Sequence, residues 1–119
     1  KPLDELVVRS LAVVDPDGKP KMTLTADETR CELSLLNSSG SQVFNLNCSD
    51  QMFEQSLMDT KNKLRYSLAM NGVDDSTRMS FFSNDEEARF ILSARPNGNF
   101  SMYLMDQSGE VTRDLYAPK

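Results

Sequence analysis

Acidic side chains gather at three places in the sequence, and carboxylate clusters of this kind can bind calcium or transfer protons. The clusters are Asp15 with Asp17, Asp74 with Asp75, and Asp85 with Glu86 and Glu87. None of them has the D-x-D-x-D-G spacing of a calcium-binding loop. Carboxylates in turn sequences are usually solvated, and outside a pocket they rarely act as general acids or bases. We therefore predict no metal site and no catalytic site at these clusters.

The chain has two cysteines, Cys31 and Cys48. Two are too few for a disulfide-stabilised scaffold or a zinc site. In the strand register derived below they lie opposite one another at a non-hydrogen-bonded pair, where a cross-strand disulfide can form in an oxidising compartment. Two small buried thiols are the alternative, and the sequence leaves both open.

Residue types that many enzymes use are missing. There is no histidine, which excludes Ser-His-Asp and Cys-His catalysis and the common histidine metal sites. Neither G-x-x-x-x-G-K-[ST] nor G-x-G-x-x-G occurs. The seven methionines are expected to fill a core, with an adaptable surface or a cavity lining as the alternative. We predict that the protein is not an enzyme and uses no cofactor.

Length and charge narrow the class of protein further. The chain has 119 residues, the size of one ordinary domain, and a net charge of −5. Its basic residues are scattered, which argues against nucleic acid as a partner. No apolar run is long enough to span a membrane. The chain begins at Lys1 rather than Met, so we expect a processed or recombinant form that a targeting segment or anchor could have preceded.

One short pattern recurs five times along the chain, and such self-similarity indicates a repeat architecture. A turn-forming residue recurs, by subtraction, at separations of 22, 22, 24 and 23: Asp15, Asn37, Asp59, Ser83 and Asp106. Three positions later stand Gly18, Gly40, Asn62, Glu86 and Gly109. Gly or Asn at this offset supplies the positive φ that a hairpin turn requires. A leucine follows at a constant offset: Leu24, Leu46, Leu68, Leu92 and Leu115. Each copy is therefore predicted to be a β-hairpin.

These hairpins predict an all-β single domain over residues 1–119, an antiparallel meander of about ten short strands. The five units lie near residues 6–26, 29–48, 52–70, 77–94 and 99–117. Such a sheet has two unpaired edges and one apolar face to protect. An up-and-down barrel would do so by closure, and a two-layer sheet by folding over. An open sheet that hides its face in a dimer or trimer is the third arrangement.

The register of the hairpins follows from their side-chain pattern. A two-residue turn at Asp17-Gly18 and its equivalents separates the residues into an apolar and a polar face. The predicted apolar pairs are Val13 with Met22, Leu11 with Leu24, Leu35 with Phe44, Leu57 with Tyr66, Phe81 with Phe90, and Met79 with Leu92. The predicted polar pairs are Ala12 with Thr23, Ser34 with Asn45, and Ser56 with Ser67. Turn chemistry at Asp15-Pro16-Asp17-Gly18 favours a type I turn with a glycine bulge, which would shift this register by one. We give the side-chain pattern more weight, because it holds in all five copies.

A ring of apolar residues near the hairpin tips is predicted to lie on the polar face. Its members are Val14, Leu36, Met58, Phe82 and Met105. They form a candidate interface for self-association or for a protein partner. Alternatively, the aliphatic stems of Lys21, Arg65 and Arg89 cover some of them.

The segment DELVVRSLAVVDPDGKPKMTL at residues 4–24 resembles a group of uncharacterised, mostly bacterial proteins. They are built of hairpin repeats of the form L-x-V-x-D-x-x-G-K-x-R-x-x-L and have no assigned activity. Lys21 stands where the repeat has Arg, and the fourth copy departs furthest, with Ser83 and Glu86 in place of Asp and Gly. The resemblance implies the repeat fold and no catalysis. Because members often look exported or membrane-tethered, it also implies a location outside the cytoplasm.

Two functions are consistent with this sequence. The first is a non-enzymatic structural or protein-interaction β module, acting as a homo-oligomer or with a protein partner. The second is a small β-barrel carrier that binds an apolar small molecule. Its interior would be lined by Phe44, Leu57, Met79, Phe81 and Phe90.

Overall fold

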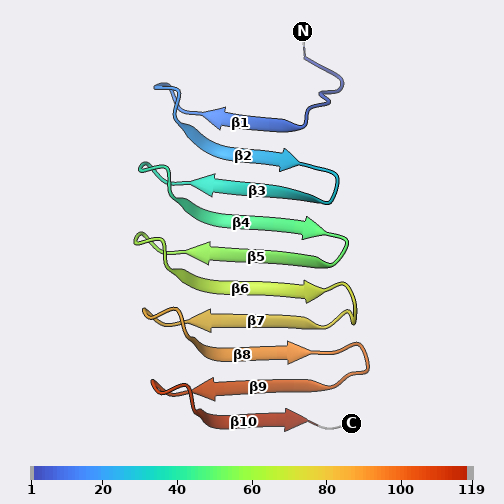
Figure 1. Cartoon of the computed structure of the whole chain (residues 1–119), viewed down its shortest axis with the longest axis vertical. Helices are drawn as coiled ribbons and strands as arrows, with labels where there is room; N and C mark the ends of the chain where they lie inside the picture. Colours follow the sequence, from blue (N-terminus) through green and yellow to red (C-terminus); the bar gives the residue numbers. More distant parts are fainter. Residues whose placement is uncertain (1, 118–119) are drawn as a thin grey trace.

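The computed structural model describes residues 2–117, and all regular structure in them is β. The strands are β1 (Ser10–Val14), β2 (Pro20–Ala26), β3 (Arg30–Leu36), β4 (Gln42–Ser49), β5 (Met52–Met58), β6 (Leu64–Asn71), β7 (Thr77–Phe82), β8 (Ala88–Ala94), β9 (Phe100–Met105) and β10 (Val111–Ala117). Each strand pairs antiparallel with the next one along the chain (Figure 1). The predicted meander of ten strands is therefore confirmed. Nothing in residues 2–117 is a helix of the length and apolarity needed to cross a membrane.

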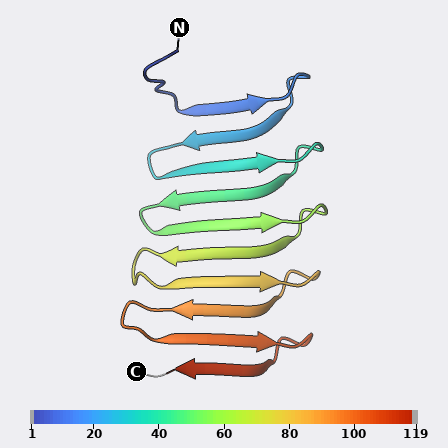
Figure 2. The same cartoon turned by 180° about the vertical axis from the view of Figure 1, so that it is seen from behind.

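The sheet is open and one layer thick. Each described strand contacts only its neighbours in sequence, and β1 and β10 form edges at opposite ends (Figures 1 and 2). The molecule measures 57 × 33 × 23 Å. Its radius of gyration is 18.0 Å, whereas a compact chain of this length would have about 13–14 Å. The predicted barrel is therefore wrong, and so is the two-layer alternative.

Straight pairing explains why the sheet does not close. One row of opposed residues crosses the sheet without a step from Val13 in β1 to Arg113 in β10. A barrel needs tilted strands whose register staggers progressively around its circumference. Because no stagger accumulates here, the first and last strands remain at opposite ends of the sheet.

The hairpin tips combine a bulged turn with the register predicted from the side-chain pattern, although the sequence suggested that the two exclude each other. The N–H of Gly18 donates to the Asp15 carbonyl over 2.9 Å, and Gly18 has a φ of 80°. This is the pattern of a type I turn with a glycine bulge, so the predicted two-residue turn is wrong. A second bulge at Lys21 then restores the predicted register, because Val14 opposes Pro20 whereas Val13 opposes Met22. The five hairpins carry this extra residue at Lys21, Val43, Arg65, Arg89 and Thr112.

Candidate interaction surface

One face of the sheet, here called the apolar face, carries two straight rows of mostly apolar side chains. The first row is Val13, Met22, Leu35, Phe44, Leu57, Tyr66, Phe81, Phe90 and Leu104. The second row is Leu11, Leu24, Leu33, Leu46, Gln55, Leu68, Met79, Leu92 and Met102. All six apolar pairs predicted from the sequence are present, so the predicted faces are confirmed.

The apolar face is largely uncovered in the part of the chain that the structure describes. In the first row, residues of odd-numbered strands protrude, with exposed fractions of 45% for Val13, 39% for Leu35, 42% for Leu57, 45% for Phe81 and 39% for Leu104. The residues between them, on even-numbered strands, are half-buried. The row is therefore corrugated, with one ridge for every second strand.

An aromatic cluster lies near the middle of the first row. The ring centroids of Tyr66 and Phe81 are 5.3 Å apart, and those of Phe81 and Phe90 are 5.7 Å apart with an edge-to-face tilt. Such pairs contribute about 0.5–1.5 kcal/mol beyond their burial. From β1 to β9 neither row contains a charged residue, and the first one reached is Arg113 on edge strand β10. The centre of this face can therefore pack against another apolar surface without burying a charge.

The opposite face, here called the polar face, contains the least exposed residues of the described chain. Ser34, Ser56 and Ser80 each have an exposed fraction of 5%, and Ile91 has 8%. The hydroxyl of Ser34 accepts hydrogen bonds from Gln42 Nε2 at 2.9 Å and from Asn45 Nδ2 at 3.3 Å. Two longer polar side chains thus close over Ser34, and the low exposure of the serines and Ile91 shows that this face supplies its own cover.

Acidic residues at the tips hold the turns together. The Oδ1 of Asp59 accepts hydrogen bonds from the backbone N–H groups of Lys61 and Lys63, at 2.8 and 2.9 Å. Its Oδ2 lies 2.7 Å from the Arg65 guanidinium. The bond from Lys63 is the main cause that lowers the pKa of Asp59 below its usual value. Asp15, with Lys21 at 3.5 Å, repeats this arrangement.

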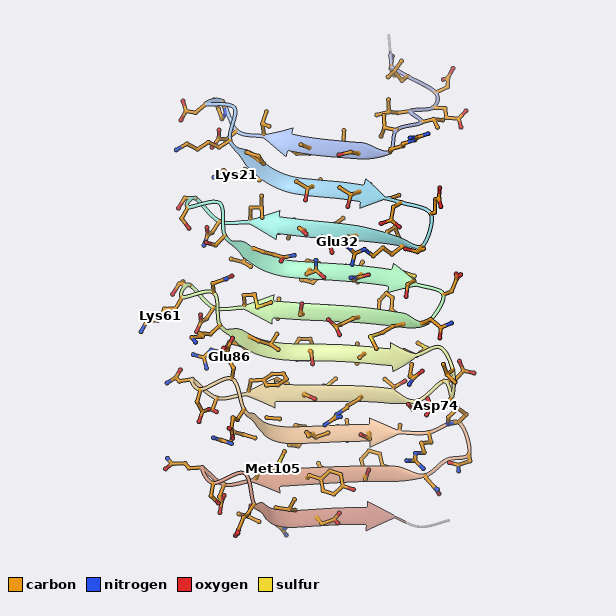
Figure 3. All side chains as sticks on the ribbon, in the orientation of Figure 1. Lys21, Glu32, Lys61, Asp74, Glu86 and Met105 are labelled. Atoms are coloured by element: carbon orange, nitrogen blue, oxygen red, sulfur yellow. The ribbon has the colours of Figure 1, made fainter. Side chains whose placement is uncertain are left out.

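The three acidic clusters do not converge on one site. Figure 3 shows Glu86 at the tip edge of the sheet and Asp74 at the opposite edge. Glu86 Oε1 accepts a hydrogen bond from the N–H of Leu64 at 3.1 Å, which ties the fourth tip to the third. Asp85 forms an ion pair with Arg89 at 3.0 Å. Among the residues described, no three acidic or cysteine side chains are close enough together to hold a metal ion.

A hollow of about 470 Å³ lies on the polar face over β7, β8 and β9. Its charged lining residues are Arg78, Arg95 and Asp74, and Tyr103 and several serines contribute hydroxyl groups. Asp74 is the one acidic residue that lines it, and the other clusters lie elsewhere. The hollow therefore offers no pair of carboxylates for acid and base catalysis.

The predicted tip ring is only partly accessible. Val14 has an exposed fraction of 51%, and the other four members are half-buried: Leu36, Met58, Phe82 and Met105. The guanidinium groups of Arg65 and Arg89 point back to the acidic residues of their own tips. This arrangement is consistent with cover by the stems of Arg65 and Arg89 at Met58 and Phe82. Val43 and Thr112 stand at the equivalent positions of the second and fifth hairpins, so no such stem is present beside Leu36 and Met105. The role of the ring as an interface stays a prediction.

Cys31 and Cys48 lie directly opposite one another, as the register predicted. They belong to a third row of the apolar face, and both are free and exposed. The alternative of two buried thiols is therefore wrong. Their disulfide stays a prediction.

Two features of the site could not be recognised in advance. The burial of Ser34, Ser56 and Ser80 runs against the usual exposure of serine, and their recurrence opposite other small polar residues was the only available signal. The extra residue in each return strand cancels the shift of the turn, so the pattern of apolar residues conceals it. No family model and no curated protein sequence matches this chain.

Proposed function

We propose that the chain is a non-enzymatic structural β module, and that it acts by packing its apolar face against another protein surface. The observation that carries this proposal is the exposure of the first row, 42% at Leu57 and 45% at Phe81, in a fold with a single layer. Contiguous apolar patches of this extent usually mark interaction sites. The uncharged centre of the face and its aromatic cluster are typical of such contacts.

Most of the charged groups at the hairpin tips already have structural partners. The acidic groups at the tips accept backbone hydrogen bonds, and the basic groups beside them form ion pairs. A carrier barrel would need an enclosed interior, which an open sheet does not provide. These points favour an interaction module over the carrier.

The two faces of strand β2 allow a matched test of this proposal. Leu24, 43% exposed on the apolar face, and exposed Thr25 on the polar face are neighbours. We expect the wild type either to self-associate through the apolar face or, as a monomer, to bind the dye ANS there. Whichever of the two is measured, Leu24→Lys should weaken it several-fold, and Thr25→Lys should leave it unchanged. A folded wild type that shows neither property, or equal effects of the two lysines, would contradict the proposal.

A further inference from the structure

The apolar face is large enough to form a complete interface. Strands spaced about 4.8 Å apart, each about six or seven residues long at about 3.3 Å per residue, give a ten-stranded face of roughly 1,000 Å². Two such faces packed together would bury roughly 2,000 Å², more than the about 1,600 Å² of a standard stable complex. A partner that covers the whole face must be flat, apolar and about as long as this sheet, and another copy of the chain meets all three conditions.

We infer that the occupant of the apolar face is a second copy of this chain, packed face to face about a two-fold axis parallel to the strands. This inference rests on the proposed function and names its partner. The same surface is used on both copies, as two-fold symmetry requires. The product is a sandwich of two ten-stranded sheets about 10 Å apart, with the polar faces outside.

The even number of strands makes the apolar face complementary to itself. A two-fold axis between β5 and β6 places β5 over β6 of the second copy and β7 over its β4, so odd strands always meet even strands. Protruding Leu57 then lies over half-buried Tyr66 of the second copy, and protruding Phe81 lies over its half-buried Phe44. Ridges thus enter grooves along the first row, which close packing of a shared core requires.

Charge does not oppose this pairing at the contact itself. Each copy has a net charge of −5, yet the two apolar rows contain no charged residue from β1 to β9. Arg113 would lie at the rim, over Val13 of the second copy, where its guanidinium can reach water. Because the remaining repulsion acts at long range between like-charged copies, added salt should tighten the pair.

The two cysteines provide an internal reporter of the pairing. In the same arrangement Cys48 on β4 lies over Thr77 on β7 of the second copy, and Cys31 on β3 lies over its Ala94 on β8. Both thiols are exposed in the single chain. Pairing therefore covers them, and their alkylation should slow as protein concentration rises.

Mass in solution is the first test. By sedimentation of the reduced protein between about 0.5 and about 50 µM, we expect a species of twice 13.4 kDa, which Leu57→Lys converts to monomer and Thr25→Lys preserves. Circular dichroism of each variant verifies that the sheet is intact. A wild type that stays monomeric at about 50 µM, or forms a larger assembly, would overturn the inference.

A second measurement needs no folded variant of the central row. Alkylation of Cys31 and Cys48 in the wild type should be at least ten-fold slower, by mass spectrometry, in concentrated than in dilute solution, since a ten-fold change reflects about 1.4 kcal/mol of protection.

Thr77→Cys should be joined between copies by a short bismaleimide, and Arg78→Cys, its neighbour on the polar face, should not. Concentration-independent alkylation would overturn the inference. A monomer with ANS binding that depends on Leu24 would leave the proposed function standing, and a monomer without it would remove both.

Discussion

The two faces of this sheet reverse the usual relation between polarity and burial. On the polar face, Ser34, Ser56 and Ser80 are 5% exposed, whereas on the apolar face Val13 and Phe81 are 45% exposed. In a single layer, a residue is covered only by its neighbours on the same face. Small Ser34 lies below the longer side chains of Gln42 and Asn45, which donate to its hydroxyl. The large apolar side chains of the other face have nothing above them. Burial therefore follows the relative size of neighbours until a second layer is added.

This difference separates two sources of stability. Contacts on the polar face are complete within one chain, so their contribution should not depend on protein concentration. The apolar rows can gain their full hydrophobic contribution only when another surface covers them, and this gain depends on mass action.

Replacing Phe81 by Ala should have the largest effect, and only in concentrated protein. In the pair its ring would be buried, and truncation of a buried aromatic residue costs about 3–5 kcal/mol of unfolding free energy. In dilute solution, where Phe81 is 45% exposed, the loss should be smaller, roughly half as large. Urea unfolding at two protein concentrations measures both values. Equal losses at the two concentrations would show that Phe81 gains no cover in concentrated protein, and would contradict the prediction.

Oxidation of Cys31 and Cys48 should be the next largest effect. Opposed residues in an antiparallel sheet have Cβ atoms about 4.5–5.5 Å apart, so small adjustments permit a disulfide. The bond would close a loop of about 18 residues and raise the unfolding free energy by about 3 kcal/mol on the chain-entropy estimate. Unfolding of oxidised and reduced protein gives the difference, and Cys31→Ser is the control. A bond that forms only between chains would contradict the register seen in one chain.

Enlarging a buried serine should lower the free energy of unfolding equally in dilute and in concentrated protein. Ser80→Leu adds volume where the exposed fraction is 5% and should cost about 1–3 kcal/mol by overpacking. Thr25→Leu, at an exposed position on the same face, should change stability by about 0.5 kcal/mol or less. Both values come from urea unfolding at the two concentrations used for Phe81→Ala. A cost for Ser80→Leu that rises with concentration would mean that the polar face also takes part in association.

The repeat and the register could be predicted because both depend on the spacing of residues that are close together in the sequence. Apolar residues at alternate positions identify the faces, and a slip of one residue would mix them. Pairs such as Val13 with Met22 and Phe81 with Phe90 follow from that constraint alone. The turn-forming residues marked the tips correctly, including the positive φ of Asn62. Glu86 also has a positive φ, which its residue type did not indicate.

Closure and burial could not be predicted, because they depend on how hairpins join. A barrel requires stagger between successive hairpins, and the links that determine it, such as residues 71–77, have no simple pattern. The extra residue, such as Arg65, was hidden because its bulge cancels the shift of the turn. Burial of Ser80 depends on the side chains of adjacent strands, which only the assembled sheet brings together.

Acid should produce the smallest effect, and it should act at the tips rather than on either face. Interactions in the folded chain lower the pKa values of Asp15, Asp59 and Asp106 below their ordinary value of 3.8, and for Asp59 the largest cause is the backbone hydrogen bond from Lys63. A carboxyl group whose pKa is lower in the folded chain stabilises it above the ordinary pKa, and this contribution is lost as the pH falls through the folded value. Stability in dilute solution should therefore decline as the pH falls below about 4 to 5.

Asp59→Asn should make that decline shallower, because an amide can still accept the turn hydrogen bonds, as Asn37 does in the second hairpin, but does not titrate. Urea unfolding of wild type and variant over this pH range measures the slopes. Identical slopes would show that the Asp59 carboxylate does not contribute to the acid response.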